Sequence, residues 1–112
     1  MASMIRLFEV EFMHDAMEFF NRIDAKAVRK IIYNVDKASY TQDSELFKKL
    51  SGEIWEFRTR FKNTNYRLLA FWDRTSVKQT LVICSHGFIK KSRKIPDREL
   101  AKAQKIRVEY FK

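Results

Sequence analysis

Turn-forming and crosslinking residues are scarce in this sequence, which has two glycines, one proline and one cysteine among 112 residues. So few glycines and prolines leave no flexible linker, and the lone Cys84 excludes an internal disulfide or a zinc site built from several thiolates. No apolar run approaches the roughly 20 residues of a membrane span, and the N-terminus lacks a signal-peptide layout. We therefore expect a single cytoplasmic domain over residues 1–112, with no membrane partner.

The chain also lacks the short motifs of several enzyme classes. It has no GxxxxGK[ST] loop for nucleotide phosphates, no HExxH zinc motif, no EF-hand and no nucleophile elbow. His, Cys, Asp and Glu are not grouped at the spacing that metal ligands need. The sequence therefore predicts neither a metal site nor a small-molecule cofactor.

Positive charge is present in excess, with 23 Lys or Arg against 14 Asp or Glu and a net charge of +9. Residues 1–45 hold six basic and eight acidic side chains, whereas residues 46–112 hold seventeen and six. This uneven placement predicts one basic face rather than a uniform basic coat. Such a face favours a polyanionic partner, although a solvated basic surface would give the same count.

Hydrophobic periodicity indicates both strands and helices. Apolar and polar residues partly alternate over 5–12, whereas apolar residues recur at steps of three and four over 14–35, as in a helix of about six turns. Asp43 or Ser44 can cap a short second helix that ends at Gly52. The elements expected in order are a strand over 5–12, helices over 14–35 and 45–50, strands over 55–61, 66–72 and 80–85, and a last helix with Asp97 as N-cap and an apolar stripe of Leu100, Ala103, Ile106 and Tyr110.

The strand over 66–72 is apolar on both faces apart from Arg67, which is typical of a central strand. The run Asn63-Thr64-Asn65 favours a hairpin turn before it, and residues 73–76 favour a turn after it. The order is therefore β-α-α-β-β-β-α. It predicts an α+β fold in which helices pack against a mainly antiparallel sheet.

Three arginines on the strands that flank the hairpin turn are the sharpest site candidates. Arg58 and Arg60 lie two residues apart and so project from the same strand face, and Arg67 interrupts an apolar row on the next strand. A buried guanidinium needs a partner, so Arg67 is expected to reach a carboxylate such as Glu56, the rim of the sheet, or an anionic ligand. Converging guanidiniums suit phosphate because their planar fork forms bidentate hydrogen bonds.

Further candidates follow the last expected strand. Basic side chains crowd one loop there, namely Lys90, Lys91, Arg93 and Lys94. His86 has an ordinary pKa of about 6.5 and can transfer protons near neutrality, although a lone strand histidine is more often a packing or hydrogen-bonding residue. Phe88 can stack on a base, and it can equally seal the core.

Three short segments occur in a set order: LSGEIWEFR over 50–58, NYRLL over 65–69 and HGFIKK over 86–91, followed by Pro96 and the terminal helix. With this order and these elements, the chain resembles the RelE/ParE toxin superfamily. More narrowly, it resembles the phage-derived HigB-like branch of type II toxin–antitoxin systems. The resemblance covers nearly the whole chain and is strongest over residues 50–103.

The resemblance implies a ribosome-dependent mRNA endonuclease that enters the ribosomal A site and cuts the translated mRNA without a metal. In such a reaction the ribose 2′-hydroxyl attacks the adjacent phosphate and expels the 5′-oxygen. This chemistry needs a base, positive charge for the phosphorane, and an acid. By resemblance, the phosphate is stabilised by Arg67 and Arg58, and the loop lysines suit backbone binding or transition-state charge.

The expected catalytic side chains are Arg67, Arg58, Lys91, His86 and Glu56. Within this set, His86 and Glu56 are only candidates for acid and base, because many relatives carry a lysine or a Tyr-His pair for that role. Expected RNA contacts come from Arg60, Lys90, Arg93, Lys94 and Phe88. The implied partners are the ribosome, mRNA and a cognate antitoxin that has acidic segments and is a helix-turn-helix DNA binder.

Two functions of other classes use the same residues. A non-catalytic nucleic-acid-binding module would make phosphate contacts through the basic face without cleaving RNA. A phage-derived interaction protein would present the same face to an acidic partner. Salt-sensitive binding to free RNA or DNA without cleavage on ribosomes would distinguish the first of these from a nuclease.

Overall fold

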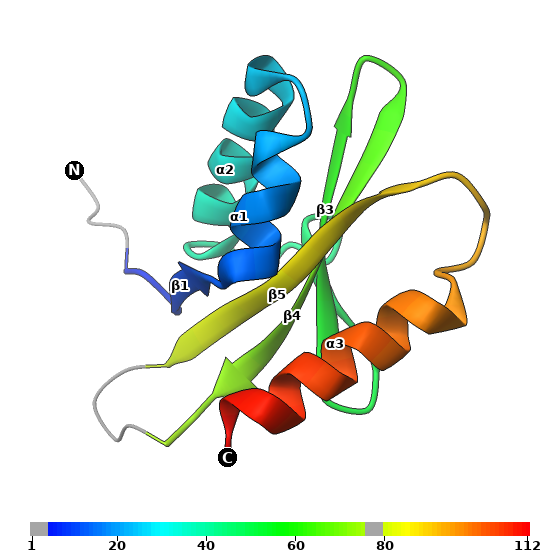
Figure 1. The fold of residues 1–112 in the computed structure, drawn as a ribbon. Coiled ribbons are helices and arrows are strands. Elements are labelled where there is room, and N and C mark those ends of the chain that lie inside the picture. The colour runs from blue at the N-terminus through cyan, green and yellow to red at the C-terminus, as the bar shows by residue number, and fades with distance from the viewer. Residues whose placement is uncertain (1–4, 76–79) are drawn as a thin grey trace.

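The computed structural model describes residues 5–75 and 80–112, which form a five-stranded sheet and three helices (Figure 1). The elements in chain order are β1 (Glu9–Phe12), α1 (His14–Asn21), α2 (Ala25–Ala38), β2 (Phe47–Ser51), β3 (Ile54–Phe61), β4 (Thr64–Asp73), β5 (Leu81–Lys90) and α3 (Asp97–Tyr110).

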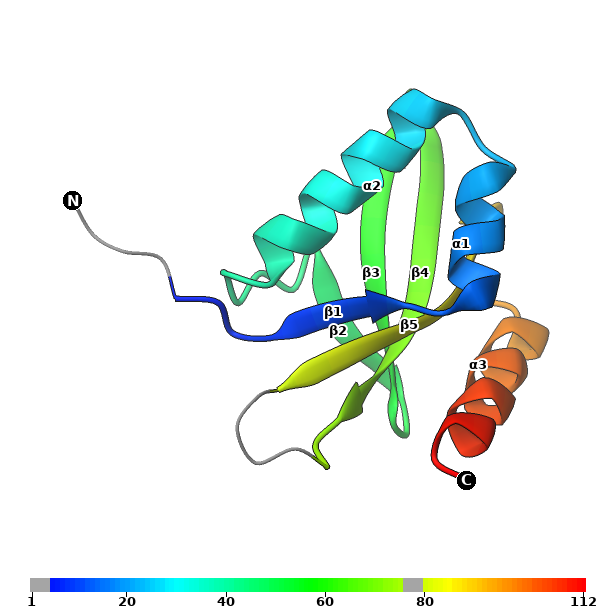
Figure 2. The ribbon, with the colours of Figure 1, turned by 60° about the vertical axis from the view of Figure 1, so that its left-hand side comes forward.

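The strands lie in the order β1-β5-β4-β3-β2. β1 pairs in parallel with β5, and the other neighbouring strands are antiparallel. The core residues of α1 and α2 pack on one face of the sheet, and those of α3 pack on the other, so that the sheet lies between α2 and α3 in Figure 2. The predicted α+β class, mainly antiparallel sheet and central strand β4 are therefore confirmed.

The single long helix expected over 14–35 is wrong, because the structure divides it into α1 and α2. The Asp24 carboxylate caps α2 by accepting a hydrogen bond from the Lys26 N–H at 3.0 Å. The break lets each helix lie along the sheet at its own angle (Figure 2). The apolar spacing continues across the break, with Ile23 packed against the core, and therefore conceals it.

The short helix expected over 45–50 is also wrong. The Asp43 carboxylate does accept a hydrogen bond from the Glu45 N–H at 2.9 Å, but the turn stops there and β2 follows. An isolated helix of this length is marginal, whereas a strand pairs with β3 and stacks Phe47 on Phe57, with ring centroids 4.2 Å apart. The two strands turn at Gly52, whose φ of +56° suits glycine.

Other element bounds differ from the expected ones by a few residues. The first strand begins at Glu9, and the hairpin turn falls on Lys62 and Asn63, both with positive φ, while Thr64 already belongs to β4. Pro96 takes the N-cap position of α3, and Asp97 is its first helical residue. The apolar stripe predicted for this helix does pack on the core of its face. Residue 76, expected in a turn, lies outside the described residues.

The last strand is longer than expected, and this changes the place of two site candidates. β5 continues to Lys90, so His86 and Phe88 lie inside the sheet rather than at its end. At Gly87 the strand lies directly beneath α1, and a Cβ there would overlap the ring of Phe19. Across residues 5–75 and 80–112, no helix is long and apolar enough to cross a membrane.

Candidate functional site

A cluster of basic side chains lies on the sheet face that α3 only partly covers. Arg58 and Arg67 are cross-strand partners on β3 and β4, and Arg60 and Lys90 both pair in register with Asn65. Cross-strand partners point to the same face of a sheet. We call this cluster the basic face; its residues are Lys48, Arg58, Arg60, Arg67 and Lys90.

Arg67 and Glu56 form a buried ion pair beneath the basic face. Arg67 Nε lies 3.1 Å from Glu56 Oε1, and the two side chains are 6% and 4% exposed. Nη1 of Arg67 also donates a hydrogen bond to the Tyr66 carbonyl at 3.1 Å. Burial lowers the pKa of Arg67, while the attraction of Glu56 opposes that shift. Of the three partners expected for Arg67, the structure therefore shows the Glu56 carboxylate.

The other two residues of the arginine group are more accessible. The Arg58 side chain is 30% exposed and approaches Glu45 at 4.0 Å, and Arg60 donates a hydrogen bond to the Asn63 amide oxygen at 3.3 Å. Lys90 is half-buried, and burial together with the nearby positive charge of Arg67 lowers its pKa. Arg58, Arg60 and Lys90 therefore offer the contact surface, whereas Arg67 contributes its charge mainly from below.

His86 lies apart from this surface, under the first turn of α3. Its Nε2 is 3.1 Å from Glu99 Oε1, its Nδ1 is 3.2 Å from Ser85 Oγ, and the residue is 2% exposed. Burial lowers its pKa, and the hydrogen bond to Glu99 opposes that shift. The structure therefore gives His86 a polar partner inside the fold and does not bring it to the basic face.

The residues of the basic loop separate at the end of β5. Lys91, Arg93 and Lys94 are exposed, and Lys94 lies 3.9 Å from Asp97 in a surface ion pair. Lys91 lines a cavity of about 480 Å³ between α1 and α3. The loop thus extends the positive charge from the basic face toward α3, with Lys91 on the side of α1. Phe88 is half-buried and packs against the core beside α3.

One comparison with known proteins decides the family. The family model described as phage-derived protein Gp49-like (DUF891) matches residues 18–108. The chain belongs to this Gp49-like family. No curated protein matched the chain. The matched range of the Gp49-like protein includes every residue of the basic face, and membership is compatible with a toxin of a toxin–antitoxin pair.

Sequence reasoning missed two residues of this Gp49-like site. Lys48 pairs in register with Glu56 and contributes to the electrostatic environment of Lys90, but the expected helix over 45–50 concealed its strand face. Glu99 was not considered as the partner of His86, because only packing brings α3 over β5. The local sequence gave no alternation that would have marked this strand, because Lys48 is followed by a second lysine.

The arrangement suits the binding of an anion better than the binding of a metal. Across residues 5–75 and 80–112, no three His, Cys, Asp or Glu side chains are grouped as a metal site would need. Burial raises the pKa of the Cys84 thiol, so a thiolate ligand is disfavoured there. The guanidinium and ammonium groups of the basic face can instead bind phosphate oxygens and stabilise charge that develops on them.

Proposed function

We propose that this Gp49-like protein is the toxin of a type II toxin–antitoxin pair and cleaves mRNA on the ribosome without a metal. The proposal joins the RelE-like and HigB-like motif order of the sequence to the family match over residues 18–108. The observation that carries it is the basic face, where Arg58 and Arg67 are direct cross-strand partners with Lys90 close by. Glu56 offsets the charge of Arg67, and an anion bound beside Arg58 would offset the positive charge that remains on this face.

In this mechanism the basic face holds the scissile phosphate while the 2′-hydroxyl attacks it. Arg58 binds the phosphate oxygens, and Arg67 adds charge that stabilises the phosphorane from beneath the face. Glu56 holds the Arg67 guanidinium in position through the 3.1 Å contact. Arg60, Arg93 and Lys94 bind the flanking RNA backbone, and Phe88 offers its exposed part for stacking.

Proton transfer is assigned to Lys90 rather than to the two residues first considered. His86 and Glu56 are both almost fully buried; Glu56 is paired with Arg67, and His86 is hydrogen-bonded to Glu99. Lys90 lies on the basic face, and its lowered pKa increases the fraction of neutral amine that can accept the 2′-hydroxyl proton. Lys91 follows Lys90 in the chain and is exposed. It then donates a proton to the leaving 5′-oxygen or binds the RNA backbone.

Induced expression in bacteria tests the proposal. The wild type is expected to stop growth and translation, and the cleaved ends of translated mRNA should map to ribosome A sites. Arg58→Ala and Lys90→Ala should relieve this toxicity, whereas Lys49→Ala should not. Lys49 is the matched control because it lies next to Lys48 on β2 but pairs with Trp55, on the opposite face. If cells that express the wild type and cells that express Arg58→Ala grow equally well, at equal protein levels and without an antitoxin, the proposed nuclease activity is refuted.

A second function has a specific observation in its favour. Because His86 and Glu56 are enclosed, the basic face presents cations without an exposed acid–base pair of the ordinary kind. A non-catalytic nucleic-acid-binding module needs only those cations. It predicts salt-sensitive binding of free RNA, no new mRNA ends on ribosomes, and no growth arrest on induction.

A further inference from the structure

Aromatic side chains line a cavity on the sheet face opposite the basic face. We call it the aromatic cavity; its volume of about 520 Å³ lies in the range of small-molecule sites. Its aromatic lining comes from the segment before β1 and from three strands: Phe8, Phe47 on β2, Trp55 on β3 and Trp72 on β4. Phe8, Phe47 and Trp72 pack with the core that α1 and α2 cover, so this cavity and the basic face are separated by the sheet.

The rings of the aromatic cavity form a partly exposed wall. Phe8 is buried, whereas Phe47, Trp55 and Trp72 are each half-buried. The ring of Trp55 lies 4.9 Å from that of Phe47 with 29° between their planes, and the ring of Trp72 stands at 81° to that of Trp55. Both tryptophans of the chain are found here. Such a wall suits a flat ring, because it offers stacked and edge-to-face contacts together.

The rest of the cavity lining is polar. Arg74 is exposed, and its Cζ lies 4.6 Å from the centroid of the Trp72 ring. It forms no ion pair with another described residue. The one acidic residue of the lining, Asp43, already accepts a hydrogen bond from the Glu45 N–H. Neutral hydrogen-bonding side chains complete the lining: Thr41, Gln42, Ser44 and Thr80.

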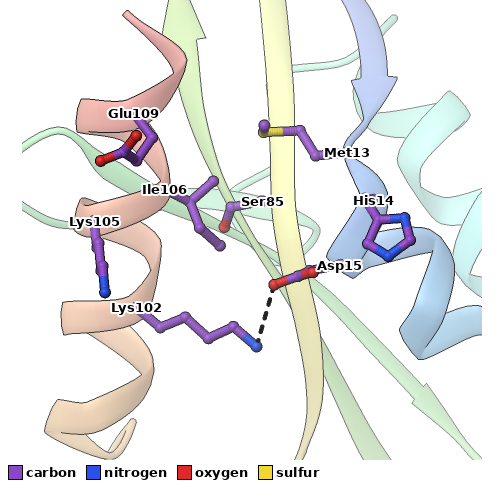
Figure 3. Close-up of a pocket in the computed structure, with 8 residues that line it drawn as sticks. All are labelled: Met13, His14, Asp15, Ser85, Lys102, Lys105, Ile106 and Glu109. Atoms are coloured by element: carbon purple, nitrogen blue, oxygen red, sulfur yellow. Dashed lines mark ion pairs between the residues drawn. The ribbon is translucent and has the colours of Figure 1, made fainter. Parts of the chain in front are cut away.

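The cavity between α1 and α3 has a different lining (Figure 3). There Lys102 of α3 reaches Asp15 of α1 at 3.5 Å across β5, and Lys105 and Glu109 add further charges. Its described lining includes no phenylalanine, tyrosine or tryptophan. A flat ligand therefore has a stacking wall in the aromatic cavity and none between α1 and α3.

We propose that the aromatic cavity binds a free mononucleotide. The base lies against the exposed parts of Trp55 and Trp72, and the Arg74 guanidinium binds the phosphate. The Gln42 amide and the hydroxyls beside it bond with the edge of the base or with the ribose. A simple aromatic acid would use the rings and the cation but leave these neutral groups without a partner. The site is on the other side of the sheet from the basic face, and the proposal does not rest on RNA cleavage.

Tryptophan fluorescence of the full-length protein tests the proposal, because both tryptophans line the cavity. The probes are the common ribonucleoside 5′-monophosphates, each titrated separately. Ribose 5-phosphate is the control that lacks the base, and the nucleoside of the tightest-binding probe is the control that lacks the phosphate. We expect at least one mononucleotide to change the fluorescence saturably below millimolar concentration. Its nucleoside should bind about tenfold more weakly, because a charge-assisted contact is lost, and ribose 5-phosphate should not bind.

Substitutions locate the bound nucleotide. Arg74→Ala should weaken binding about tenfold, and so should Trp55→Leu, in which Trp72 remains as the reporter. Arg98→Ala is the matched control, since this arginine is exposed on α3 and does not line the cavity. Arg58→Ala removes a cation of the basic face instead. Neither of these two variants should change the affinity, and circular dichroism confirms that each variant is folded.

Three results would overturn the proposal. The first is no saturable change with any mononucleotide at millimolar concentration, and the second is an affinity that neither Arg74→Ala nor Trp55→Leu alters. The third is a single-stranded RNA oligonucleotide that binds more tightly than every mononucleotide and loses affinity in Arg74→Ala. That result would assign the aromatic cavity to RNA rather than to a free nucleotide. Nucleotide binding that persists in Arg58→Ala keeps this site distinct from the proposed nuclease, whichever way the toxicity test turns out.

Discussion

Arg67 and Glu56 lie on neighbouring strands and form an ion pair inside the sheet, with Nε and Oε1 3.1 Å apart. The partner of Arg67 on β3 is Arg58, so the Glu56 carboxylate balances a guanidinium that faces another cation. The pair is therefore structural and electrostatic at once. It holds the Arg67 guanidinium directly beneath the surface on which we place the phosphate, and the net positive charge of that surface comes from its other cations.

Removal of one member of this pair should strongly destabilise the fold. Glu56→Ala leaves the buried Arg67 guanidinium without its counterion, which costs about 3–5 kcal/mol in comparable pairs. Urea unfolding of the variant measures that loss in free energy. A double variant, Glu56→Leu with Arg67→Met, should recover most of it, because neither charge is then left buried. Equal stability of Glu56→Ala and wild type would contradict the pairing.

The buried histidine should make stability depend on pH. Burial and Lys102 lower the pKa of His86, and the carboxylates of Glu99 and Asp15 oppose them. The unfolded chain therefore binds this proton at a higher pH than the folded chain does, so the free energy of unfolding should fall as pH drops below about 6.5. The pH dependence between 5 and 8 should weaken in His86→Gln and persist in the control His14→Gln, whose side chain is exposed.

The contact between α1 and β5 should not tolerate a larger residue at position 87. Gly87→Ala places a Cβ against the ring of Phe19, and overpacking of this kind costs about 1–3 kcal/mol. Thermal or urea unfolding measures the loss. The second-site change Phe19→Leu opens room beside the strand and should offset part of it. If the losses in unfolding free energy of Gly87→Ala and Phe19→Leu simply add in the double variant, the two residues do not compete for the same space.

Binding of RNA at the basic face should depend on salt in proportion to the contacts made. Loss of one phosphate contact lowers the slope of log affinity against log salt by about 0.7 for a single strand. Arg60→Ala and Lys90→Ala should each reduce the slope by about that amount, measured by fluorescence anisotropy with a labelled single-stranded RNA. Lys49→Ala, on the other face of β2, should leave the slope unchanged.

Strand parity made part of the basic face predictable. Arg58 and Arg60 occupy alternate positions, so their common face followed from the period of a strand, whereas the pairing of β3 with β4 put Arg67 directly beside Arg58. The errors arose where local signals were weak or ambiguous. The capping residue Asp43 begins only one turn, and the pairing of Phe47 with Phe57 overrides the short helix. The break before Asp24 was hidden because apolar residues continue across it.

The amino-acid sequence by itself determined the α+β class, the central strand and the side of the domain that carries the positive charge. Each depends on periodicity or composition within a single segment. Only the tertiary structure decided that Glu56 pairs with Arg67, that His86 is enclosed beside Glu99, and that β1 pairs with only the first part of β5. These relationships join segments far apart in the chain, and which polar groups meet or stay unpaired depends on how the layers pack.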